Sequence, residues 1–234
     1  MRFSALATPV RDCSLCPRLA DYRNAQQELH PDWFNAPVPS FGDPQPELLI
    51  VGLAPGLRGA NRTGRPFTGD YAGDLLYDTL LKFGLARGLY DARSDDGLTL
   101  HRVRITNAVR CVPPQNKPEP GEISTCRQFL TAEIAALPKL RAILALGAIA
   151  HQSIVTALGL RTQAFRFAHG RLHALPSGLV LANSYHCSRL NTNTGKLSAA
   201  MFEAVFANLG FWLSSPIGLS PVTGDGETAV SVPG

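Results

Sequence analysis

The sequence lacks any long apolar run. A helix needs roughly 20 consecutive apolar residues to cross a bilayer, and no stretch of the chain approaches that length, which excludes a helical integral membrane protein. The first ten residues contain one arginine and no extended apolar stretch, so we expect no secretory signal peptide and a cytoplasmic location. The chain also shows no internal repeat. These absences favour an ordinary globular protein.

Neither sign of charge dominates the composition. Lys and Arg number 22 against 18 Asp and Glu, a net charge of +4. This balance permits a polyanionic partner without requiring one, and a solvated basic surface explains it equally well. With 45% hydrophobic and 17% charged residues, the chain is neither collagen, nor wholly disordered, nor a disulfide scaffold.

The length of 234 residues suits one large domain. A chain of this size can bury roughly 70% of the surface that its unfolded form exposes, so its core needs no covalent staples. We expect one domain over residues 1–213. Residues 214–234 are mainly Ser, Pro, Gly and Thr without periodicity, and we expect a disordered tail there.

Strand and helix patterns alternate along the chain. Apolar runs predict five strands, over residues 47–53, 103–109, 142–146, 171–175 and 180–185. Helical periodicity falls between them and after them, over residues 72–83, 123–137, 149–158 and 197–209. This alternation predicts an α/β protein in which helices cover both faces of a parallel sheet.

Three of the predicted strands run into segments of unusual composition, which span residues 52–70, 107–114 and 186–195. Ligands of open α/β sheets bind at the carboxyl ends of the strands. The first segment has five glycines, and its Arg58, Arg62 and Arg65 could bind phosphates or carboxylates. A solvated glycine loop is the alternative, and no Gly-Lys-Ser/Thr follows, which excludes a Walker-type phosphate loop.

The first segment resembles motif A of the uracil-DNA glycosylase superfamily. Its Gly-Leu-Ala-Pro-Gly from Gly52, and its Gly-Ala-Asn-Arg-Thr-Gly-Arg-Pro-Phe-Thr-Gly-Asp up to Asp70, are similar to the type 5 (B-type) family. Type 4 enzymes carry Glu where this chain has Leu53, and type 1 enzymes carry a blocking Tyr where it has Gly56. The resemblance therefore implies a broad range of substrate bases.

The other two segments fit the same family. Asn107 precedes Ala-Val-Arg-Cys, as the family's base-reading Asn does, although an isolated Asn often only caps a turn. His186-Cys-Ser resembles motif B, usually His-Pro-Ser, with Cys187 in place of Pro. His186 alone could be a core histidine, and we interpret Cys187 as a small buried filler.

The resemblance implies a fold, a reaction and a set of roles. The fold is a three-layer α/β/α sandwich around a central, mainly parallel four-stranded sheet. The reaction removes uracil and other deaminated or modified bases from DNA for base excision repair, with Asp70 and His186 catalytic. Asp70 would equally make a good helix N-cap, and Phe67 a core residue. The implied base-binding residues are Gly52, Leu53, Ala54, Phe67 and Asn107. The implied DNA-binding or wedge residues are Arg58, Arg62, Ser188, Arg189 and Leu190.

Four of the five cysteines form a candidate metal centre. Cys13-Ser-Leu-Cys16 is a chelating pair, and Cys111 and Cys126 follow much later. Four thiolates can bind zinc or an iron–sulfur cluster, and spacing does not choose between them. The resemblance implies a structural [4Fe–4S] cluster on these four residues. Zinc is the alternative, and a thioredoxin-like redox role finds no βαβ unit around Cys13.

The expected partner is damaged DNA, double- or single-stranded, bound by a monomer without a membrane. Two rival functions stay open. One is a narrow uracil-only enzyme of type 4, which Leu53 argues against. The other is a DNA-binding homologue that has lost catalysis, which Asp70, Asn107 and His186 argue against.

Overall fold

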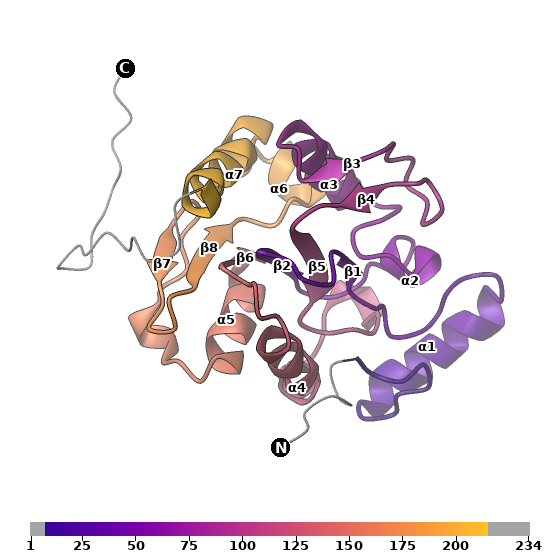
Figure 1. The fold of residues 1–234 in the computed structure, drawn as a ribbon. Helices are drawn as coiled ribbons and strands as arrows, with labels where there is room; N and C mark the ends of the chain where they lie inside the picture. The colour runs from indigo at the N-terminus through magenta and orange to yellow at the C-terminus, as the bar shows by residue number, and fades with distance from the viewer. Residues whose placement is uncertain (1–7, 215–234) are drawn as a thin grey trace.

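A computed structural model describes residues 8–214, and Figure 1 shows its fold. The predicted tail lies almost wholly outside these residues; only Ser214 is described, as the last residue of a helix. The centre is a six-stranded sheet with strand order β1-β5-β2-β6-β8-β7. Its four inner strands run parallel, and they are β5 (Val103–Asn107), β2 (Leu48–Gly52), β6 (Ala142–Leu146) and β8 (Val180–Ser184).

The sheet is larger than the four strands expected. Two short antiparallel strands extend its edges, β1 (Phe41–Gly42) beside β5 and β7 (Leu172–Ala174) beside β8. The strand predicted over residues 171–175 is therefore confirmed as β7. β1 has only two residues, too few to leave an alternating pattern in the sequence. A separate two-stranded sheet joins β3 (Ala86–Arg87) to β4 (Thr99–Leu100).

Helices cover both faces of the sheet, as Figure 1 shows. The four predicted helices are present as α3 (Tyr71–Lys82), α4 (Pro120–Ala135), α5 (Ala148–Ala157) and α7 (Ala199–Ser214). Shorter helical segments are α2 (Ala60–Thr63), α6 (Arg189–Asn193), η1 (Pro114–Asn116) and η2 (Thr162–Ala164). Among residues 8–214, no helix has the length and apolarity that crossing a membrane requires.

Alternation along β2 builds the two cores. Leu48 and Ile50 face α3 and α7, whereas Leu49 and Val51 face α4 and α5, and all four are fully buried. A strand buried on both faces reads as a continuous apolar run, which is why this strand was visible in the sequence. The three-layer sandwich is confirmed.

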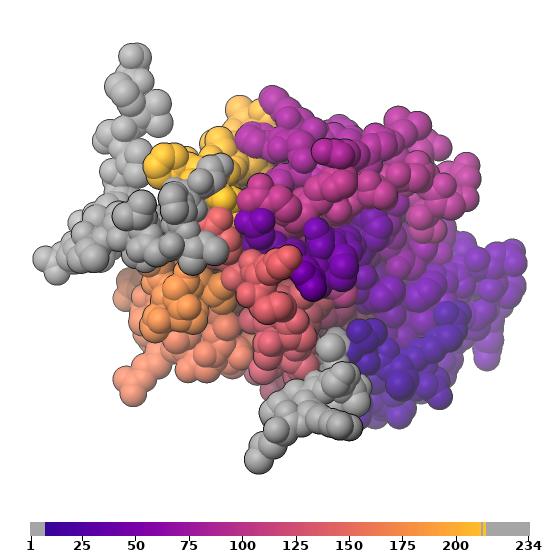
Figure 2. Space-filling model, in the orientation of Figure 1, coloured from indigo at the N-terminus to yellow at the C-terminus, as the bar shows by residue number. Residues whose placement is uncertain are grey.

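The N-terminal helix α1 (Pro17–Leu29) packs outside these layers. Leu19 joins Val109, Phe129 and two cysteines in a third, smaller apolar cluster. Arg18 clamps the start of α4 through a bidentate pair with Glu122 at 2.8 Å. In the space-filling view the N-terminal segment (indigo) forms a continuous surface with its neighbours (Figure 2).

A buried ion-pair network ties β5 to α4. Glu133 accepts from Arg104 at 2.7 Å and from Arg110 at 2.5 Å, and Arg110 also donates to Ser40. Burial acts to raise the pKa of Glu133, but Arg110 and Arg104 outweigh it and hold that pKa below its usual value. Glu133 is therefore ionised, and its single negative charge is shared by the buried Arg110 and the part-buried Arg104.

Replacing Glu133 by Gln should lower the free energy of unfolding by about 3 kcal/mol, because it leaves the buried Arg110 without its counter-charge. Urea denaturation at neutral pH measures this loss. The matched control is Glu203→Gln, which breaks the surface pair with Lys82 and should cost under about 1 kcal/mol. Equal losses in the two variants would contradict the role assigned to the network.

Candidate active site

A cleft of about 650 Å³ opens at the carboxyl edge of the sheet. All three segments singled out in the sequence reach it, because β2, β5 and β8 end at this edge. Nine of the twelve predicted base-, DNA-binding and catalytic residues line it: Leu53, Ala54, Arg58, Phe67, Asp70, Asn107, His186, Ser188 and Arg189. Gly52, Arg62 and Leu190 do not.

Asp70 occupies the floor of a glycine-lined recess. A Cβ at Gly56 would lie 2.8 Å from Asp70 Oδ2, and one at Gly59 would lie closer still. Both glycines therefore give the carboxylate the space it fills. Asp70 is the N-cap residue of α3, as the alternative interpretation expected, but its side chain makes no capping hydrogen bond and Oδ1 is buried without a partner.

Burial and the start of α3 act on the pKa of Asp70 in opposite directions. Desolvation raises the pKa of its carboxyl above the ordinary value, and the backbone N–H groups of Ala72 and Gly73 act in the opposite direction. The helix α3 points its N-terminus at the carboxylate, which favours the anion there. A carboxyl group with an unsatisfied oxygen is thus held at the wall of the cleft.

Asn107 is the last residue of β5 and lies opposite Gly52 in the parallel register. Its side chain is 3% exposed, and its Oδ1 has no hydrogen-bond partner. A Cβ on Gly52 would overlap that oxygen and would lie 2.6 Å from Phe67 Cζ. Gly52 therefore does not line the cleft, but it makes room for two side chains that do.

Phe67 holds a strained backbone conformation. Its φ of +54° lies in the left-handed region, which a residue with a bulky side chain rarely adopts. The conformation turns its ring into the cleft, where the ring stacks on His186 with centroids 5.9 Å apart. A backbone outlier at such a place is typical of a functional site.

Arg65 does not line the cleft. It is buried, it forms a bidentate pair with Asp96 at 2.7 and 2.6 Å, and it donates to Thr68 Oγ1. Of the two ligands considered for it, carboxylate is confirmed and phosphate is wrong. Tyr77 reinforces the same turn by donating to the carbonyl of Pro66 at 2.6 Å. These contacts hold the residues on either side of Phe67.

His186 follows β8 and lines the same cleft as Asp70 and Asn107. Burial lowers the pKa of its imidazole, so the ring is neutral near pH 7 and can donate one N–H. Asn191 donates to the His186 carbonyl at 2.8 Å, and Ser188 caps α6, so the loop is fixed from within. Cys187 is fully buried, as expected for a filler, with its Sγ 3.3 Å from the Ala72 carbonyl.

The predicted DNA contacts lie around the rim. The Arg189 guanidinium stacks over the Tyr71 ring at 5.2 Å, which joins the two sides of the cleft. Leu190 follows it on α6 and is 72% exposed. Arg58 is exposed at the rim, whereas Arg62 lies outside the cleft and donates to the Arg58 carbonyl.

Sequence reasoning missed several lining residues. Tyr71 is one of them, and its position directly after Asp70 was the available signal. Asn116 is another, and its φ of +57° continues an unusual turn that begins at Gln115. The Pro-rich composition between Cys111 and α4 indicated a loop there, but nothing indicated that the loop returns to the cleft.

The four predicted metal ligands come together elsewhere. Cys13, Cys16, Cys111 and Cys126 all line one small cavity between α1, the loop after β5 and α4. All are free thiols, and among residues 8–214 no three His, Cys, Asp or Glu side chains are arranged to hold a single ion. Arg23 is buried and donates to Cys111 Sγ at 3.2 Å. The donor set suits a group that binds soft thiolates.

Comparisons with known proteins agree with this geometry. The family described as "Uracil DNA glycosylase superfamily" matches residues 39–210. The chain is 45% identical to a type-5 uracil-DNA glycosylase of Thermus thermophilus, over 86% of this chain and 94% of that protein. It is 42% identical to the type-5 enzyme of Mycobacterium leprae, over 86% of this chain and 91% of that protein.

A type-4 relative is also similar, but over a smaller part of the chain. The type-4 uracil-DNA glycosylase of Pyrobaculum aerophilum is 33% identical over 70% of each chain. On the extent of the family match and the identity to its members, the chain belongs to the uracil DNA glycosylase superfamily.

Proposed function

We propose that the protein is a DNA glycosylase that hydrolyses the N-glycosidic bond of uracil, and of other deaminated or modified bases, in DNA. The observation that carries this is a convergence of three groups. A half-buried carboxylate, a buried amide and a neutral imidazole from three separate segments line one cleft, and two of them have an oxygen without a partner. Relatives named type-5 uracil-DNA glycosylases support it.

The amide and the ring account for base recognition. Asn107 offers a donor and an acceptor on one planar edge, which complements N3–H and O4 of uracil, whereas cytosine presents the reverse pattern. Its unpartnered Oδ1 would accept from N3–H. The Phe67 ring supplies a face on which the base stacks. A base inside a duplex reaches this cleft only after rotation out of the helix.

The carboxylate and the imidazole account for bond cleavage. Breaking the bond leaves an oxocarbenium-like sugar and an anionic base, so the site must stabilise separated charges. His186 donates its N–H to O2 of the departing base. Asp70 stabilises the sugar cation and orients the attacking water. Leu190 on the rim is placed to fill the vacated stack as an apolar wedge.

The cysteine cavity supports a structural [4Fe–4S] cluster as the cofactor, with zinc as the alternative. The cluster would be held by Cys13, Cys16, Cys111 and Cys126. Arg23 supports an anionic group there, because a guanidinium that is 4% exposed has no carboxylate within ion-pair distance among residues 8–214 and instead faces Cys111. Bound to its thiolates, the cluster would cross-link α1 to the segment after Asn107.

Asp70→Asn should lower the rate of uracil release at least about 100-fold, because the charge that stabilises the sugar cation is lost. The variant should be no less stable than the parent, since burial disfavours the native carboxylate. Single-turnover release from a G·U duplex and thermal unfolding measure the two effects. Near-native release by a folded variant would remove Asp70 from the mechanism.

The pH dependence of the parent enzyme follows from the same shift. The rate should fall as the pH drops through the raised pKa of Asp70, so the acid limb lies above the ordinary Asp value of about 3.8. Residual activity of Asp70→Asn should lack that limb.

The substrate range separates the broad enzyme from a uracil-only one. With Gly56 and Leu53 in the cleft, no side chain blocks substituents on the base, so we expect release of hydroxymethyluracil, hypoxanthine and xanthine as well as uracil. Chromatography of bases released from matched duplexes measures it. Release of uracil alone would favour the narrow function, and release of none would leave a DNA-binding protein.

Cys13→Ser should remove the cofactor, whereas Cys187→Ser should retain it, because Cys187 lies outside the cavity and its hydrogen bond to Ala72 can be made by a serine hydroxyl. Iron and zinc content and the visible spectrum of the purified proteins measure this. Zinc in place of iron would establish the alternative cofactor. Equal metal content in the two variants would contradict the ligand assignment.

A further inference from the structure

The charges of the chain are unevenly distributed. Residues 134–214 contain a single acidic residue, Glu203, and seven basic ones: Lys139, Arg141, Arg161, Arg166, Arg171, Arg189 and Lys196. The net charge of the whole chain is only +4, so the remainder is slightly acidic. The basic character therefore belongs to the part that carries β6, β8, β7 and α7.

The basic residues differ in whether they are neutralised. At the amino ends of the strands, Arg102 and Arg141 pair with Glu47, and Arg104 pairs with Glu133. Arg166 and Arg171 are exposed, and neither has a carboxylate within ion-pair distance among residues 8–214. The same is true of Lys196 and of Arg189. Unpaired positive charge is what a polyanion would neutralise.

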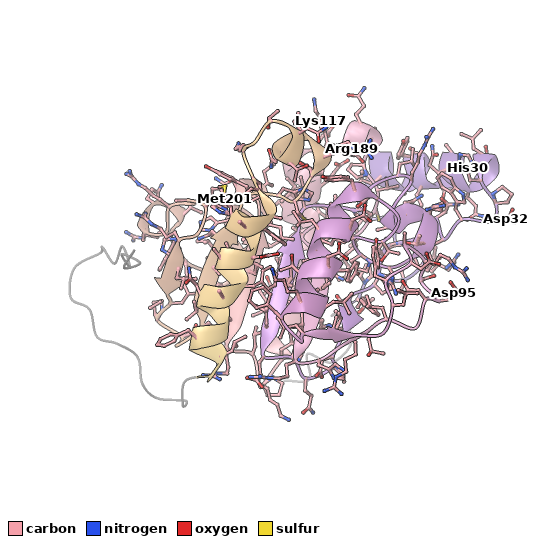
Figure 3. The ribbon with its side chains drawn as sticks, turned by 90° about the horizontal axis from the view of Figure 1, so that it is seen from above. His30, Asp32, Asp95, Lys117, Arg189 and Met201 are labelled. Atoms are coloured by element: carbon pink, nitrogen blue, oxygen red, sulfur yellow. The ribbon has the colours of Figure 1, made fainter. Side chains whose placement is uncertain are left out.

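The sheet topology places this charge at the cleft. β7 runs antiparallel to β8, so the segment before β7 lies at the carboxyl end of β8, where His186 follows. The Arg171 carbonyl accepts from the backbone N–H and the side-chain amide of Asn183, at 3.1 Å each. In Figure 3, Arg189 lies at this same upper edge, together with Lys117.

Aromatic rings are interleaved with these cations. His169 stacks on Tyr185 with centroids 5.0 Å apart, and the backbone N–H of Tyr185 donates to His169 Nδ1 at 3.1 Å. Lys196 Nζ lies 4.8 Å from the centroid of the Tyr185 ring. Tyr185 directly precedes His186 in the chain. Basic and aromatic groups in one strip are typical of surfaces that track a nucleic-acid strand.

We propose that Arg166, Arg171 and Lys196 form a second DNA-binding surface, here called the basic edge, which holds the sugar-phosphate backbone of the DNA that leaves the cleft on the His186 side. The proposal rests on the proposed function, since the flipped nucleotide fixes where that backbone begins. The exposed, unpaired cations fit phosphates, and the basic edge is continuous with the cleft through Tyr185. Lys and Arg contacts of this kind add affinity without reading sequence.

The test compares two variants of equal charge. One is Arg166→Gln with Arg171→Gln on the basic edge. The control is Arg87→Gln with Lys139→Gln. Both control residues are associated with the amino ends of the strands, away from the carboxyl ends where the cleft opens. Lys139 directly precedes β6, and Arg87 lies in β3, whose partner β4 leads to the start of β5. The probe is a fluorescent duplex with a tetrahydrofuran abasic-site analogue, which cannot be hydrolysed, and anisotropy gives its Kd over a range of salt concentrations.

Each lost phosphate contact should reduce the slope of log K against log salt by about 0.9. The basic-edge variant should therefore lose about 2 from the slope and bind about tenfold more weakly at low salt, while the control stays at the parent values. Uracil release from a short single-stranded oligonucleotide at saturating enzyme should be unchanged in both, because such a substrate need not reach the basic edge.

Equal slopes for the two variants would overturn the basic edge, even if uracil is released normally. The proposed function would fail differently, by the absence of base release from every uracil-containing substrate by the parent protein, whatever the slopes show. Thermal unfolding checks that both variants fold, and neither Arg166 nor Arg171 uses its side chain in a polar contact within residues 8–214.

Discussion

The register between β2 and β5 is the constraint on which the site depends. It sets Gly52 beside Asn107 at the same edge of the sheet, and the missing side chain of Gly52 is the space that the Asn107 amide and the Phe67 ring occupy. A one-residue slip would turn each side chain to the other face and would move a branched residue into that space. The glycines of the loop repeat the principle, because Gly56 and Gly59 leave room for Asp70. The glycines of this loop are therefore required by the protein's own side chains, whether or not a ligand also needs the space.

The same arrangement has an energetic cost. Two buried oxygens without partners in the protein, on Asp70 and Asn107, are each unfavourable by roughly 1–3 kcal/mol. Phe67 adds backbone strain. Rigid neighbours hold these groups in place: the Arg65–Asp96 pair beside Phe67, and the Arg110–Glu133 pair beside Asn107. A substrate that satisfies the two oxygens would recover what the free protein forgoes, which is how a preorganised site favours its ligand.

The sequence predicted the parts that repeat or run continuously. The buried strands and the long helices leave apolar patterns, and the three strand ends were identified because a parallel sheet must bring them to one edge. The positions of residues that depend on contacts with distant parts of the chain could not be predicted from the sequence. Arg65 was grouped with Arg58 and Arg62 because all three lie in one basic loop, yet its fate is decided by Asp96, 31 residues away. Asn116 reaches the cleft only through two left-handed residues that no local pattern signals.

The cysteine cavity and the cleft share one piece of chain, so a group bound by the cysteines would also help to position the cleft. Asn107, which we propose reads the base, lies four residues before Cys111, while Ala54 packs against the cysteine cluster and also lines the cleft. Two backbone hydrogen bonds, from the Ala108 N–H to the Gly52 carbonyl and from the Val109 N–H to the Leu53 carbonyl, continue the β2–β5 pairing beyond Asn107. Beyond these bonds, the Arg110 side chain donates to Glu133, and the Arg110 backbone N–H donates to Cys126 Sγ at 3.4 Å. A cluster bound to all four thiolates would make the second anchor covalent, and the accuracy with which Asn107 meets a base would then depend on a site it never touches.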